Sequence, residues 1–124
     1  METWSITDLA DEYGVTLRTI RFYEDRGLIS PERRGTQRIF HPRDRVRLGL
    51  ILRGRRLGFS LSQIATIVDM YDAEPGEAGQ LRYLIEQIDG RRLELEQRRK
   101  DIDETIADLD QVERRCREDL ERLS

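Results

Sequence analysis

The chain has 124 residues, a length that favours one small domain carrying an appendage. Charged residues make up 38% of it and aromatic residues only 6%, which is too charged for a single compact globule and typical of long exposed helices. The single cysteine, Cys116, excludes an intrachain disulfide and fits a reducing compartment. The longest apolar run, residues 48–52, is far too short to cross a membrane, and no signal peptide is seen, so we expect a cytoplasmic protein with no membrane contact.

The net charge of −3 conceals two halves of opposite sign. Residues 16–56 carry twelve arginines against four acidic side chains, whereas residues 73–124 carry ten basic and fifteen acidic side chains. Basic patches attract nucleic acid, and an acidic helical block suits a protein partner. The distribution therefore indicates a DNA-binding head followed by a partner-binding tail.

Two short helices are predicted at the start of the chain, over residues 4–13 and 16–26. In the first, apolar residues at positions 6, 9, 10 and 13 follow the spacing of an amphipathic helix, with Thr7 as the expected N-cap. A turn at Gly14 separates it from the second helix, which we expect Gly27 to terminate in a left-handed conformation. This succession predicts a helix-turn-helix.

The second helix has one face suited to a core and another suited to DNA. At 100° per residue, Arg18 and Phe22 point outward when Ile20 points inward, and Arg21 lies at the flank. The inner face is completed by Thr16 (also the expected N-cap), Leu17, Tyr23 and Glu24. A basic outer face on the second helix of this motif predicts that the helix enters the major groove of DNA.

Residues 28–40 are predicted to form a small β-hairpin next to the helix-turn-helix. Gly35 marks a turn, and Ile39 and Phe40 are good strand residues. We expect this wing to face DNA phosphates with its arginines, which are Arg33, Arg34 and Arg38. The alternative is a solvated charged loop, which the adjacent helix-turn-helix disfavours.

Two further helices complete the predicted head. The first begins at Pro42, after His41, and ends at Gly58. Its expected apolar face comprises Val46, Leu48, Leu50, Ile51 and Leu57, and its basic face comprises Arg53, Arg55 and Arg56. Ser60 and Gln63 match a capping box that opens the second, which runs to about Tyr71. His41 is the only histidine and lacks partners for a metal site.

After a linker over residues 72–79, one long helix is predicted from Gln80 to Leu123. Apolar residues recur every seventh position, and a second seam lies four residues on, as in a coiled coil. The first seam reads Leu81, Ile88, Leu95, Ile102, Leu109, Cys116 and Leu123, and the second reads Ile85, Arg92, Arg99, Ile106, Glu113 and Leu120. Such a helix needs a partner to bury its stripe, which disfavours a solvated single helix held by charge pairs.

The interruptions of the second seam favour antiparallel pairing. Parallel pairing would set Arg92, Arg99 and Glu113 each against its own copy, and facing like charges are destabilising. The fold expected is thus mainly α: a winged helix-turn-helix (residues 1–71), a linker (72–79) and an antiparallel coiled-coil dimerisation helix (80–124). Antiparallel pairing separates the two Cys116 residues, which excludes a disulfide or two-thiolate metal site between them.

Family-level motifs are present at residues 14–15, 18–24, 27–28, 38–40 and 57–64. Through these motifs the sequence resembles the MerR family of bacterial transcription regulators, and the resemblance covers residues 4–70. It implies a dimer that binds a pseudo-palindromic promoter operator and distorts it, with RNA polymerase at the promoter. The implied DNA-binding residues are Thr16, Arg18, Thr19, Arg21, Phe22, Tyr23, Arg34, Arg38, Arg53 and Arg56. Phe22 and Gln37 depart from the tyrosines that the family commonly has there.

The dimer would form through Leu81, Ile85, Ile88, Leu95, Ile102, Ile106, Leu109, Cys116, Leu120 and Leu123. Residues 33–35 and 51–54, with the start of the linker, resemble a subgroup that controls leucine, isovalerate and acyl-CoA breakdown. A small-molecule effector would bind near Tyr71, the linker and Tyr83, and no metal or other cofactor is expected. No nucleophile–base pair or phosphate loop indicates an enzyme. A non-specific architectural DNA-binding protein is the alternative.

Overall fold

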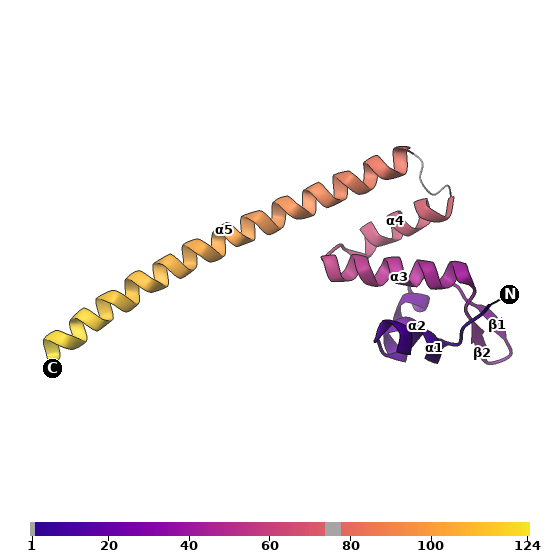
Figure 1. Ribbon diagram of the computed structural model, residues 1–124, viewed down its shortest axis with the longest axis horizontal. Coiled ribbons are helices and arrows are strands. Elements are labelled where there is room, and N and C mark those ends of the chain that lie inside the picture. The colour runs from indigo at the N-terminus through magenta and orange to yellow at the C-terminus, as the bar shows by residue number, and fades with distance from the viewer. Residues whose placement is uncertain (1, 74–77) are drawn as a thin grey trace. The chain divides into compact units, whose positions relative to one another are not determined.

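The computed structural model describes residues 2–73 and 78–124, except for the side chains of residues 71–73. The fold is mainly helical with one small hairpin, as the sequence predicts (Figure 1). The chain divides into two units, Met1–Leu84 and Ile85–Ser124, which are described separately below. In chain order the elements are α1 (Ile6–Tyr13), α2 (Leu17–Asp25), β1 (Glu32–Arg34), β2 (Gln37–Ile39), α3 (Pro42–Leu57), α4 (Leu61–Ala73) and α5 (Ala78–Leu123).

Helix α1 begins at a capping box formed by Ser5 and Asp8. The Ser5 hydroxyl accepts from the Asp8 N–H at 3.0 Å, and the Asp8 carboxylate accepts from the Ser5 N–H at 2.9 Å. The prediction that Thr7 is the N-cap was therefore wrong. Ser5 has an extended backbone and precedes the first helical residue, whereas Thr7 already lies in the first turn.

Helix α2 begins and ends as predicted. The Thr16 side chain accepts from the Thr19 N–H at 3.1 Å, which confirms Thr16 as the N-cap. At the other end Gly27 has a φ of 74°, in the left-handed region that favours glycine. Between these ends Ile20 is fully buried, so the inner face of the helix is the one the periodicity indicates.

The hairpin β1–β2 is antiparallel, which confirms a wing at this position rather than an irregular loop. Its register pairs Glu32 with Ile39 and Arg33 with Arg38 across the strands. Phe40, just after β2, exchanges two backbone hydrogen bonds of 2.9 Å with Trp4. This bridge attaches the base of the hairpin to the segment that precedes α1.

The buried face of α3 agrees with the prediction at Leu48 and Ile51 but not at Val46 and Leu57. Leu48, Ile51 and Gly54 are buried, whereas Val46 and Leu57 are 41% and 47% exposed. The buried residues are spaced three apart, and a 100° step puts Val46 about 200° from Leu48. The apolar run at residues 48–52 covers more than one face of the helix. Periodicity alone therefore did not show that Val46 and Leu57 lie outside the buried stripe.

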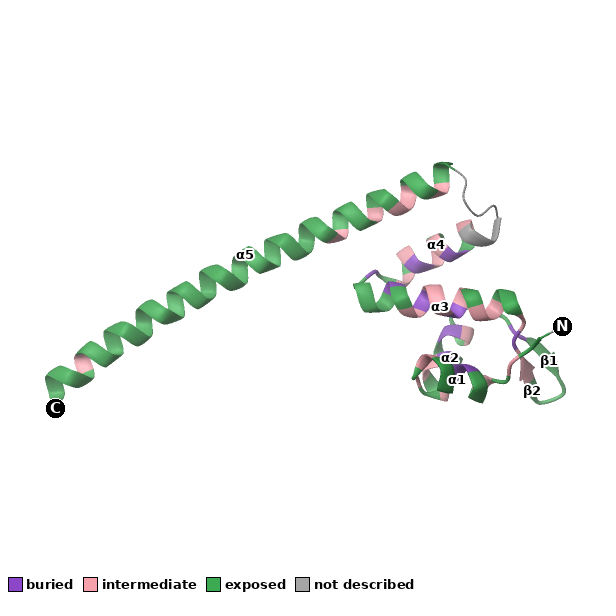
Figure 2. Cartoon of the chain, in the orientation of Figure 1, coloured by how far each residue is buried: buried purple, intermediate pink, exposed green. Residues whose placement is uncertain are grey.

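The core of the first unit lies between α1, α2, the hairpin end, α3 and α4 (Figure 2). Helix α4 starts at the predicted capping box, in which the Ser60 hydroxyl accepts from the Gln63 N–H at 3.1 Å and the Gln63 side chain accepts from the Ser60 N–H at 2.9 Å. Among the residues whose burial is described, the largest fully buried side chains are Leu9, Ile20, Ile29, Phe40, Leu48, Ile51, Ile64 and Val68.

Helix α5 is a continuous helix of 46 residues that buries none of its side chains (Figure 2). It begins at Ala78, two residues before the predicted start, and α4 continues to Ala73. Of the predicted linker, residues 74–77 lie outside the described part of the chain. Every predicted dimerisation residue on α5 is exposed in the single chain, including Cys116.

Candidate nucleic-acid interface

The outer face of α2, continued by its C-cap, carries two arginines and one aromatic ring. Arg18, Phe22 and Arg26 follow one another at intervals of four residues, so they form a single stripe that turns only slowly around the helix. The guanidinium of Arg26 lies 4.8 Å from the centroid of the Phe22 ring, in a cation–π contact. Phe22 is 39% exposed, so this stacked pair presents its charge at the surface.

Arg26 is not among the predicted DNA-binding residues, although its spacing from Arg18 and Phe22 places it on the same stripe. The predicted DNA-facing part of the helix ends at residue 24, and the next two residues are predicted to be the helix end. The last helical residue is Asp25, and Arg26 is the C-cap, so its side chain still continues the stripe. Contact with Phe22 then orients it.

Arg21 and Thr19 lie at the flanks of this stripe. Arg21 is exposed and, with Thr36, Gln37 and Arg38 of the hairpin, lines an open groove of about 510 Å³ beside the start of α1. The Thr19 and Thr16 hydroxyls lie 2.9 Å apart, and Thr16 also caps the helix. The groove therefore joins the flank of α2 to the hairpin.

Tyr23 and Glu24 occupy the inner side of α2, in agreement with the helical periodicity. Tyr23 is only 6% exposed and belongs to the core cluster, so its ring is not part of the outer stripe. The resemblance to the MerR family assigns Tyr23 to DNA binding, but in this structure its ring has a packing role. Glu24 faces the hairpin.

Two hairpin arginines are held by Glu24. Arg33 donates to Oε1 of this carboxylate at 2.5 Å, and Arg38 donates to Oε2 at 2.6 Å. The Glu24 side chain is 14% exposed, and that of Arg38 is 18% exposed. Burial raises the pKa of Glu24, but the hydrogen bonds and charges of Arg38 and Arg33 outweigh it and hold the pKa below its ordinary value.

The third hairpin arginine is the most exposed. Arg34 donates to Glu32 at 2.6 Å from the same strand, with 68% of its side chain accessible. Hydrogen bonds from Arg34 and His41 lower the pKa of Glu32, so this carboxylate is ionised at neutral pH. The three wing arginines are therefore not equivalent, and only Arg34 extends fully toward solvent.

Arg53 and Arg56 lie on the exposed side of the last turns of α3. Among the described residues, no hydrogen bond or ion pair joins either of them to α2 or to the hairpin. Their predicted contribution to DNA binding thus rests on the resemblance and on their charge.

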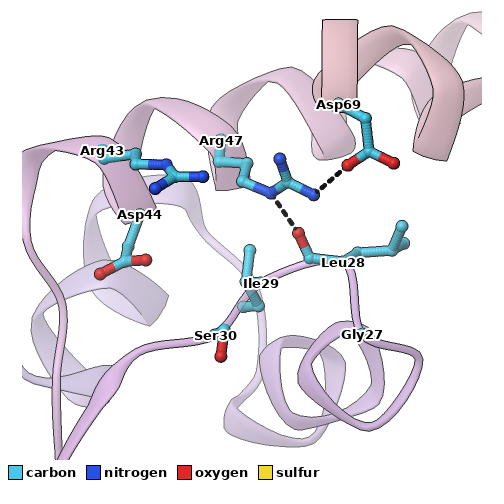
Figure 3. Close-up of a pocket in the computed structure, with 8 residues that line it drawn as sticks. All are labelled: Gly27, Leu28, Ile29, Ser30, Arg43, Asp44, Arg47 and Asp69. Carbon is cyan, nitrogen blue, oxygen red and sulfur yellow. Dashed lines mark hydrogen bonds and ion pairs between the residues drawn. The ribbon is translucent and has the colours of Figure 1, made fainter. Parts of the chain in front are cut away.

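Arg47 fixes the end of α2 against α3 and α4 (Figure 3). From α3, its guanidinium donates to the carbonyl oxygen of Leu28 at 2.5 Å, just after α2. It also donates to the Val68 carbonyl at 3.2 Å and to the Asp69 carboxylate at 2.8 Å, both on α4. One side chain therefore connects three segments and holds the end of α2 in place.

An apolar pocket of about 300 Å³ is formed by α3, α4 and the first turns of α5. Its lining comprises Leu50, Ile67, Met70, Gln80, Leu81, Tyr83 and Leu84. Tyr83 belongs to the region predicted for an effector; the side chain of Tyr71 and residues 74–77 lie outside the described part of the chain. Among the described residues no group of three or more His, Cys, Asp or Glu side chains could hold a metal ion.

No helix in the described part of the chain is both long and apolar enough to cross a membrane.

Comparison with known families identifies the fold. A profile described as "MerR HTH family regulatory protein" matches residues 4–71, more than half of the chain. The chain belongs to the MerR family. A second profile, described as "MerR, DNA binding", matches residues 45–112. The protein is therefore a MerR-type, helix-turn-helix DNA-binding regulator of transcription.

Sequence similarity to individual MerR regulators supports this assignment. The mercuric resistance operon regulatory protein of Shigella flexneri is 33% identical over 116 residues, covering 91% of this chain and 72% of that protein. The regulator HmrR of Rhizobium leguminosarum bv. viciae is 29% identical over 107 residues, covering 82% of this chain and 83% of that protein. For other regulators matched, the chain spans between 30% and 60% of their length.

Solved structures of the family share the architecture. A MerR-family regulator from Bacillus cereus superposes with a TM-score of 0.71 at 25% identity, over 89% of this chain and 79% of that one. HiNmlR, a MerR-family regulator solved bound to promoter DNA, superposes with a TM-score of 0.60 over 82% of this chain and 80% of that one. At 21% identity the second match shows the fold alone.

Proposed function

We propose that the protein acts as a homodimer that binds a pseudo-palindromic promoter operator sequence-specifically. By distorting this operator, the dimer would control transcription by RNA polymerase from the promoter. The observation that carries this proposal is the outer stripe of α2, with Arg18 and Arg26 on either side of Phe22. Arginine reads guanine through two parallel hydrogen bonds in the major groove. A helix that offers exposed arginines beside a flanking wing is suited to base readout.

The exposed seam of α5 supports the dimer. Ile102 and Leu95 are 58% and 46% exposed on a helix without any buried residue, and such a stripe is stable only when another helix covers it. In an antiparallel pair the half that bears Arg92 and Arg99 lies across from the half that bears Glu113. The two copies of α2 in a twofold-symmetric dimer would read inverted half-sites, which is why we expect a palindrome.

We also propose that the apolar pocket beside Tyr83 binds the effector. Its volume of about 300 Å³ is at the lower end for ligand sites, so it suits an acyl chain or another small apolar group. The resemblance to regulators of leucine and acyl-CoA breakdown makes isovaleryl-CoA the first ligand to titrate. Calorimetry that detects no heat with acyl-CoA compounds at millimolar concentration would contradict this part of the proposal.

Selection of bound fragments from a library of source-genome DNA tests the main proposal. We expect one enriched palindrome inside a promoter. Even recovery of all fragments, with a steep salt dependence, would instead support the alternative of an architectural protein that binds through phosphate contacts alone.

Substitution of Arg18 tests base readout directly. Arg18→Ala should lower the ratio of operator affinity to random-duplex affinity by at least about 5-fold, because the loss of one bidentate contact costs about 1–3 kcal/mol of discrimination. Arg115→Ala, which removes the same charge from an exposed position of α5, should leave that ratio unchanged. An equal loss of both affinities in Arg18→Ala would show that Arg18 contacts phosphate only.

A further inference from the structure

The hairpin carries an electrostatic conflict that its register creates. Arg33 and Arg38 are directly opposite one another across β1 and β2. Like charges at such a cross-strand pair repel, and a two-stranded hairpin has little stability of its own. The two guanidinium groups therefore need a nearby anion to hold this register.

Glu24 of α2 supplies that anion with both of its oxygens. Arg33 binds Oε1 and Arg38 binds Oε2, at 2.5 and 2.6 Å, so one carboxylate bridges the repelling pair. The carboxylate is largely enclosed, and the base of the hairpin is held separately by the Trp4–Phe40 bridge. Glu24 thus fixes the face of the hairpin to the helix that carries the outer arginines.

The same contact limits what the two arginines can do with DNA. A guanidinium hydrogen-bonded to a carboxylate is partly neutralised and oriented, so it attracts phosphates less than a free one does. Arg34, on β1 beside Arg33, stays exposed and pairs with Glu32 of its own strand. Of the hairpin arginines, Arg33 and Arg38 are the ones restrained by α2.

We propose that Glu24 is a positioning residue for specificity: it locks Arg33 and Arg38 against α2, which keeps the wing in register with the major-groove helix and suppresses their binding to arbitrary phosphates. This inference rests on the proposed function, because it assigns the wing a part in operator discrimination. If Glu24 has this role, an acidic side chain favours the specific complex even though it lies on a surface that binds a polyanion.

The test is the salt dependence of binding to a duplex of random sequence. Glu24→Gln keeps the side-chain shape but frees two guanidinium groups in each protomer. We expect tighter binding to the random duplex and a plot of log affinity against log salt that is steeper by up to about 2 for each protomer. Affinity for the operator should change less, so that discrimination falls several-fold.

Three further variants separate this mechanism from loss of folding or of net charge. Asp11→Asn removes the same charge from an exposed position of α1 and should leave the slope unchanged. Glu24→Asp keeps the carboxylate and should lie close to the wild type in slope. Adding Arg33→Gln and Arg38→Gln to Glu24→Gln should abolish the gain in random-duplex affinity.

The outcomes separate the inference from the function on which it rests. A Glu24→Gln protein that binds random DNA no more tightly, with an unchanged or shallower slope, would overturn the positioning role and leave a structural one. A wild-type protein that does not distinguish its selected fragments from random DNA would overturn the proposed function. In that case, the slope of log affinity against log salt for random DNA would still measure whether Glu24 restrains the two arginines.

Discussion

Gly54 of α3 faces Ile64 of α4 so closely that a methyl group on Gly54 would lie 2.9 Å from the Ile64 Cγ1 atom. Gly54 is buried, and Ile64 is 1% exposed, so the isoleucine has no free space into which it could move. The absence of a side chain at residue 54 thus allows the two helices to pack at this distance. This contact helps to set the position of α4 over the helix-turn-helix.

Gly54→Ala should destabilise the protein in spite of the better helix propensity of alanine. Overpacking of a core costs about 1–3 kcal/mol, more than the roughly 0.5–1 kcal/mol gained by replacing a helical glycine. Urea unfolding followed by the fluorescence of the single tryptophan, Trp4, should therefore show an earlier midpoint. Gly90→Ala is the matched control, because nothing lies within 4 Å of its Cβ position on α5. An unchanged midpoint in Gly54→Ala would show that α3 and α4 separate easily.

The features that the sequence predicts well are local ones. Thr16, Gly27 and the Ser60–Gln63 box are recognisable because each acts on a backbone group within a few residues of itself. Gly54 has a role that depends on another helix, and nothing in its neighbourhood along the chain indicates Ile64. The pairing of Glu24 with the hairpin could not be predicted for the same reason, because it joins two different elements. Periodicity placed Glu24 on the inner face, but only the folded hairpin shows which side chains it contacts there.

The N-terminal cap of α1 gives a sharp test of two neighbouring hydroxyl residues. Ser5→Ala should lose about 1 kcal/mol of stability, because it removes one hydrogen bond of the capping box and leaves the Asp8 N–H without its partner. Thr7→Ala should stay within about 0.5 kcal/mol of the wild type, since Thr7 is exposed inside the first turn. Trp4 fluorescence in urea measures both. The reverse order of the two midpoints would restore Thr7 as the cap.

Arg47 should contribute far more to stability than its exposed partner does. Arg47→Met keeps the apolar stem but leaves the carbonyl oxygens of Leu28 and Val68 without this donor, and we expect a loss of about 1.5–3 kcal/mol. Asp69→Asn weakens only an ion pair whose carboxylate is 69% exposed, so the loss should be under about 1 kcal/mol. Thermal unfolding of both variants makes the comparison. Equal losses would mean that the ion pair, rather than the carbonyl contacts, anchors the loop after α2.

The seam of α5 can be tested by placing charge on it. Leu95→Asp combined with Ile102→Asp should abolish the proposed dimer, because each change removes an apolar contact and puts a carboxylate at the helix–helix interface, at a cost of at least about 2 kcal/mol. Sedimentation velocity should then show a monomer, and operator binding should be lost with it. Leu93→Asp is the matched control: Leu93 is 67% exposed and lies outside both seams, so this variant should remain dimeric. A double variant that stays dimeric while Leu93→Asp dissociates would move the interface to another face of α5.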